Sequence, residues 1–148
     1  MADFLTKGDW KPIFAIYGVM LSAYFIHPLG RKLPLWPILD ILLAFTLIYP
    51  TAKIDRKLFE GNLKYSTISL IFILFISTVT DALVRVFLFI PVGLFSLFGL
   101  TSEVYAIFIA GAIDSYIEDA LVVAVSFIIG TPLLKILKKM PEFKYYIS

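Results

Sequence analysis

The stretch from Tyr65 to Ile90 restricts the possible folds more than any other part of the chain, because it contains no glycine and no proline. As one helix it would measure about 39 Å, which exceeds the roughly 30 Å hydrocarbon core of a bilayer. The helix must therefore either tilt or break, and residues 77–80 offer a break at which Thr80 could cap a new helix. Long apolar runs of this kind are typical of transmembrane helices.

Composition places the whole chain in the membrane class. Of its 148 residues 60% are hydrophobic and the mean hydropathy is +0.93, whereas soluble domains average about 45–50% apolar residues. This length leaves room for one core, so residues 1–148 are expected to form a single integral membrane domain in contact with the lipid bilayer. The net charge of +2 indicates no nucleic-acid partner.

The chain is expected to be an all-α, polytopic transmembrane helical bundle. Prolines and a glycine between residues 27 and 34 separate the first two apolar runs. We expect six short helices, over residues 13–27, 35–50, 65–79, 81–98, 102–112 and 115–137. In the alternative arrangement, four spans cross the membrane and residues 91–112 form a re-entrant segment that is buried in protein.

Positive charge is concentrated in two polar segments. Residues 51–64 carry four lysines and arginines, and residues 135–148 carry four lysines. Cytoplasmic segments of membrane proteins are enriched in these residues. We therefore expect a cytoplasmic loop over 51–64 and a cytoplasmic tail over 138–148. Both termini would then lie in the cytoplasm, in a multi-pass protein of the cell membrane.

Acidic residues gather at the start of the last apolar run, although a charge at the centre of a membrane helix costs at least about 2.5–3.5 kcal/mol. Asp114 and Glu118 are four residues apart and share one helix face. Asp119 points about 140° away from Asp114 on the helical wheel. Asp81 and Arg85 also have the four-residue spacing and are expected to pair.

Both arrangements bring these two charged groups to the external side of the membrane. We expect them to line an externally open polar pocket, with two tyrosines as amphipathic walls, formed by Asp81, Arg85, Tyr105, Asp114, Tyr116 and Glu118. Because carboxylates outnumber the arginine, the pocket would suit a cationic or hydroxyl-rich solute, or protons. The alternative is that these groups lie at headgroup level and cap helix N-termini.

Three further features have a simpler structural interpretation. Gly18 and Ser22 put two small residues on one helix face, where a partner helix can dock, although internal packing is the simpler explanation. Asp40 is interpreted as a helix-start residue that complements the helix dipole. His27 lies among turn residues and is interpreted as a turn or interface residue rather than a proton relay.

The sequence lacks the motifs of common catalytic sites. It has no H-E-x-x-H, no G-x-S-x-G and no glycine-rich phosphate loop. With no cysteine and a single histidine, it also has no thiolate site and no multi-histidine metal centre. We therefore expect neither enzymatic activity nor a metal or other cofactor.

Size, short helices, cytoplasmic termini and an outward-facing pocket resemble the substrate-binding S components of energy-coupling-factor vitamin and metal importers. The closing sequence Gly130-Thr-Pro-Leu-Leu-Lys-Ile-Leu-Lys-Lys139 is similar to the C-terminal end of that family, over about the last 40 residues. The resemblance implies a solute-binding subunit of an uptake transporter, whose solute would contact the six pocket residues. It also implies docking on a transmembrane coupling subunit with ATPases. The family's first helix often carries Ala-x-x-x-Ala for this docking, where this chain has Gly18-x-x-x-Ser22.

A second function remains open from the sequence. The chain would instead be a structural or accessory subunit of a larger membrane protein complex, in which its charges pair with those of a partner.

Overall fold

The computed structural model describes residues 9–58 and 63–137, and this part of the chain is helical with no strand. The expected all-α class is therefore confirmed. Five α-helices and two short 3-10 helices follow one another: α2 (Trp10–Ile26), η1 (Gly30–Lys32), η2 (Trp36–Ile38), α3 (Leu39–Leu58), α4 (Leu63–Phe89), α5 (Leu94–Leu97) and α6 (Val104–Leu137). The expected cytoplasmic tail, 138–148, and the N-terminal residues 1–8 lie outside the described residues.

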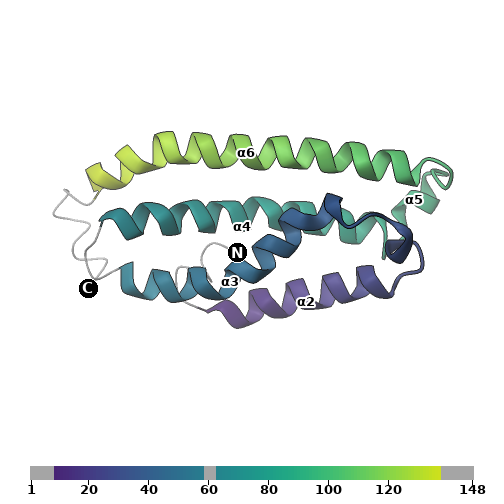
Figure 1. Ribbon diagram of the computed structural model, residues 1–148, viewed down its shortest axis with the longest axis horizontal. Helices are drawn as coiled ribbons and strands as arrows, with labels where there is room; N and C mark the ends of the chain where they lie inside the picture. The colour runs from purple at the N-terminus through teal and green to yellow at the C-terminus, as the bar shows by residue number, and fades with distance from the viewer. Residues whose placement is uncertain (1–8, 59–62, 138–148) are drawn as a thin grey trace.

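The four long helices run along the long axis of the molecule, and the chain turns back between one and the next (Figure 1). α4 lies in the middle and contacts α2, α3, α5 and α6. α6 runs along one side, where it packs on α4 and on η2, while α2 and α3 lie on the other side of α4. α4 is thus the central helix, and α6 is a peripheral one.

α4 is one continuous helix, whereas the sequence led us to expect two helices, over 65–79 and 81–98. The hydroxyl groups of Thr78 and Thr80 donate to the carbonyls of Leu74 and Ile76, one turn earlier, at 3.0 and 2.6 Å. Since these hydroxyls bond inside the helix, neither caps a new one. Within α4, residues Ser69–Phe89 form the one described helix that is long and apolar enough to cross a membrane.

α3 also extends further than expected. The helix was expected to end at Pro50, but Pro50 lies inside α3, which continues to Leu58. Thr51 and Ala52 directly after it are buried, so packing favours the helical backbone despite the hydrogen bond that proline cannot donate. The first part of the expected 51–64 loop is therefore helical, and residues 59–62 of it lie outside the described residues.

α6 replaces the two helices expected over 102–112 and 115–137. Gly111 lies at the expected boundary, but the helix continues through it, and a Cβ atom added there would meet nothing within 4 Å. The chain turns instead at Gly93 and Gly99, which have φ angles of 82° and 68° and flank the short α5. Glycine adopts such positive φ angles at no steric cost. The described residues thus contain four long helices, and residues 104–112, which the alternative arrangement assigns to a re-entrant segment, belong to α6.

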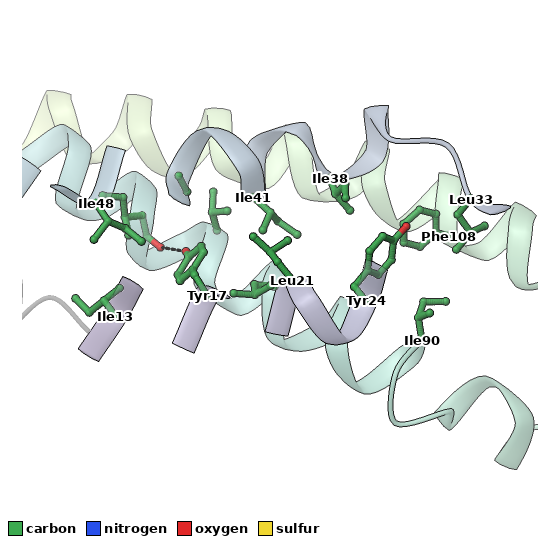
Figure 2. Packing of buried hydrophobic residues seen from close by; sticks show 14 of the residues in the cluster. Ile13, Tyr17, Leu21, Tyr24, Leu33, Ile38, Ile41, Ile48, Ile90 and Phe108 are labelled. Carbon is green, nitrogen blue, oxygen red and sulfur yellow. Dashed lines mark hydrogen bonds between the residues drawn. The ribbon is translucent and has the colours of Figure 1, made fainter. Parts of the chain in front are cut away.

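The core lies between α2, α3 and α4 and is built largely from isoleucine and two tyrosines (Figure 2). Tyr17 is fully buried, and its hydroxyl lies 3.2 Å from the carbonyl of Ile76 and 2.9 Å from Oγ1 of Thr80. Tyr24 stacks on Phe108 of α6, with ring centroids 6.2 Å apart. These contacts hold α2 against α4 and bring one end of α6 to the core.

Candidate functional site

Three of the expected pocket residues meet across α4 and α6. The guanidinium of Arg85 lies 2.5 Å from Asp81 Oδ2, which is the pairing that the four-residue spacing predicts, and 2.9 Å from Glu118 Oε2. The three side chains are between 48% and 66% exposed. In water such exposed pairs contribute about 0–1 kcal/mol each, so they position Arg85 more than they stabilise the fold.

Tyr116 lies close to this group but has another role. Its hydroxyl donates to the backbone carbonyl of Trp36, and the two rings stack at 6.4 Å between centroids. Tyr116 therefore joins α6 to η2. The other two expected pocket residues, Tyr105 and Asp114, have exposed side chains and line neither of the two cavities that the structure forms near Arg85.

Two carboxylates that were not among the expected pocket residues are the most buried acids at this site. Asp40 and Asp119 are 6% and 5% exposed. Asp40 lies in the first turn of α3, as expected, where its Oδ1 accepts the backbone N–H of Ile41 at 2.8 Å. Asp119 comes from α6, and its buried Oδ2 has no hydrogen-bond partner among the described residues.

The signal for Asp119 was present on the helical wheel. Its rotation of about 140° from Asp114 turns it toward α3, whereas Asp114 faces outward. For Asp40, no sequence pattern distinguishes a helix-start carboxylate in solvent from one covered by another helix. Only the packing of α6 against η2 places Asp119 opposite it.

A first cavity of about 220 Å³ lies between α3, α4 and α6. Its polar lining comes from one residue of each helix: Asp40, Arg85 and Ser115. The other lining residues are Gly111 and eight apolar residues: Pro37, Ile41, Ala82, Val86, Phe89, Ile107, Phe108 and Ala112. A few polar groups converging in an apolar cavity are typical of small-molecule sites.

A second cavity of about 790 Å³, open on one side, lies between η2, α3, α4 and α6, and its lining includes the exposed residues Trp36, Leu39 and Leu43. Asp40 and Asp119 supply its carboxylates, and Trp36, Phe75 and Tyr116 supply aromatic walls. Its other lining residues are aliphatic: Leu39, Leu43, Ala120, Val123 and Ala124. Asp40 is thus common to both cavities.

The smaller features of the sequence are placed as follows. His27 caps the C-terminus of α2 and its Nδ1 accepts the Leu29 N–H at 3.3 Å, so it is a turn residue. Ser22 is exposed, and a Cβ atom added at Gly18 would meet nothing within 4 Å. Internal packing therefore does not explain this pair, and their face of α2 is open. Among the described residues, no group of three or more His, Cys, Asp or Glu side chains is arranged to hold a metal ion.

Comparisons with protein-family models, with curated proteins and with solved structures find no match to this chain.

Proposed function

We propose that the chain is an integral membrane protein that binds a small cationic or hydroxyl-rich solute in the first cavity, as the solute-binding subunit of an uptake transporter. The observation that carries this proposal is the convergence of Asp40, Arg85 and Ser115 from three helices on one otherwise apolar cavity. Asp81 and Glu118 both pair with the Arg85 guanidinium, and Asp40 adds a third carboxylate to the lining of the cavity. This excess of negative charge favours a positively charged or hydrogen-bond-donating solute.

A membrane location is supported by the outer surface of the bundle as well as by Ser69–Phe89. The outward side of α6 exposes a series of large apolar side chains: Ile113, Ile117, Leu121, Val125, Phe127, Ile128, Ile129, Leu133 and Ile136. Monomeric soluble proteins rarely expose so extended an apolar surface. We propose that the long helices all cross the bilayer, with both termini in the cytoplasm as the distribution of lysine and arginine indicates.

The resemblance to S components of energy-coupling-factor importers supports the transport role within this proposal. An S component has no ATPase of its own, so the chain would dock on a coupling subunit. The open face of α2 at Gly18 and Ser22 offers a surface on which a partner helix can approach closely.

Thermal unfolding of the purified full chain in mild detergent tests the solute site. Polyols, amino alcohols and small amines are screened for those that raise the melting temperature, because a ligand that binds only the folded state stabilises it. We expect Ser115→Val and Asp40→Asn to remove the stabilisation by an active solute, because they delete the hydroxyl and the carboxylate of the cavity lining. Asp114→Asn is the matched control, because it removes a charge from an exposed residue outside the cavity. Equal stabilisation in all three variants would rule out the first cavity as the site.

An accessory role in a larger membrane complex is the second candidate function. The observation that favours it is the exposed apolar side of α6. Among the described elements, α6 makes its main contacts with α4 and η2, so its opposite side is available to a partner subunit. Isolation in mild detergent separates the two functions. Subunits that co-purify at fixed stoichiometry, with no solute effect on melting, would support the accessory role.

A further inference from the structure

We propose that the second cavity is a binding site for an organic monocation with an apolar body. This site goes beyond the proposed function, because it uses neither Arg85 nor Ser115 and shares only Asp40 with the lining of the first cavity. Three properties of the cavity lead to this ligand: its charge, its walls and its size.

The charge of the cavity is negative and is not balanced by its own lining. Asp119 is 5% exposed, its side chain lines the cavity, and no N–H or O–H group of the described residues donates to its buried Oδ2. Of the described residues that line the cavity, none is a lysine or an arginine. A buried carboxylate oxygen without a donor is unfavourable, so an ammonium group placed between Asp119 and Asp40 would supply the missing donor and the missing charge.

The walls of the cavity are suited to an apolar body rather than a hydrated ion. Trp36 and Tyr116 stack with an interplanar angle of 21°, and the bond from the Tyr116 hydroxyl to the Trp36 carbonyl holds the two rings together. Phe75 of α4 belongs to the same lining. Aromatic faces attract cations as well as apolar groups. An organic ammonium ion can therefore satisfy the carboxylates and the walls at once.

The size of the cavity also favours an organic ligand. A volume of about 790 Å³ lies within the range of small-molecule sites, about 300–1,000 Å³. A single inorganic ion would leave the apolar walls unfilled. The described residues also lack the third ligating side chain that a metal site would need.

Fluorescence titration of the full chain in detergent tests this site with phenethylammonium as the probe. The sequence has two tryptophans, and Trp10→Phe leaves Trp36, which lines the cavity, as the reporter. Phenethyl alcohol has the same shape without the charge. We expect saturable quenching by phenethylammonium, and binding of the alcohol weaker by about tenfold or more, since a buried charge pair contributes strongly.

Two neighbouring variants make the test specific. Asp119→Asn should weaken phenethylammonium binding by about tenfold or more, whereas Glu118→Gln, which removes the same charge from an exposed neighbour, should change it by less than about threefold. Equal binding of the alcohol, or equal losses in the two variants, would overturn the site. If Asp119→Asn does not fold, the site is tested by the ratio of the affinities of phenethylammonium and phenethyl alcohol for the chain with Asp119 intact. Ser115→Val should leave phenethylammonium binding unchanged, so failure of the first cavity is distinguishable from failure of the second.

Discussion

Glu118 and Asp119 are consecutive residues of α6 with the same charged group, yet they lie in opposite environments. Glu118 is half exposed and bonded to Arg85. Asp119 is 5% exposed and faces Asp40, another carboxyl group. A rotation of about 100° per residue around the helix is enough for this difference. The comparison teaches that neighbouring acids on one helix can differ completely in environment: Glu118 has a cationic partner in solvent, whereas Asp119 keeps a buried oxygen without a hydrogen-bond partner among the described residues.

The largest expected change in the free energy of unfolding is that of Asp119→Asn, and its sign is opposite to that expected for Glu118→Gln. We expect Asp119→Asn to raise the free energy of unfolding by about 1–3 kcal/mol in the absence of ligand. The amide removes a buried charge, and it can donate a hydrogen bond to Asp40. Unfolding of the full chain by titration with a denaturing detergent measures this change. Asp114→Asn, at an exposed position, should stay within about 0.5 kcal/mol of the wild type, and destabilisation by Asp119→Asn would break the comparison.

Arg85→Gln should have the next largest effect, in the destabilising direction. It removes both ion pairs at once, each of which contributes about 0.2–1 kcal/mol when exposed, so we expect a loss of about 1 kcal/mol. It also leaves Asp81 and Glu118 without a shared cation. The same unfolding titration measures the loss, and an unchanged stability would mean that the exposed acids have no stabilising partner.

Glu118→Gln should destabilise by about 0.5 kcal/mol, because one exposed pair is lost while Asp81 still holds Arg85. This loss should shrink in 1 M salt, where the screening length is about 3 Å. Measurement of unfolding at low and high salt checks both statements. If the effect of Glu118→Gln had the same sign and size as that of Asp119→Asn, burial would not distinguish the two residues.

Asp81→Asn should have the smallest effect, about 0.3 kcal/mol, since an i,i+4 pair on one helix is weak and Glu118 remains bonded to Arg85. A double-mutant cycle with Glu118→Gln sharpens the result, because it isolates the coupling between the two acids through Arg85. Coupling below the measurement error would indicate that the two acids act independently.

Much of the fold could be predicted from the sequence, because apolar runs, prolines and glycines mark helices and turns directly. The all-helical class and the pairing of Asp81 with Arg85 are both present in the structure. The helix breaks were harder to place. Threonine hydroxyls at 78 and 80 can cap a helix or bond within one, and Gly111 can end a helix or lie on its exposed side.

The candidate site could be predicted only in part, since it depends on contacts between helices far apart in the sequence. Asp40 and Asp119 are 79 residues apart, and neither is special within its own helix. What makes them a site is that η2 holds α6 against the start of α3, through Tyr116 and the Trp36 carbonyl. Spacing along one helix does not contain this information.

Asp40 belongs to the lining of both cavities, and this shared wall has a thermodynamic consequence. A positive ligand on one side of the carboxylate weakens the field that remains for a ligand on the other side. If both cavities bind cations as proposed, their occupancy would be anticooperative, and linkage would require each ligand to lower the affinity of the other by the same factor.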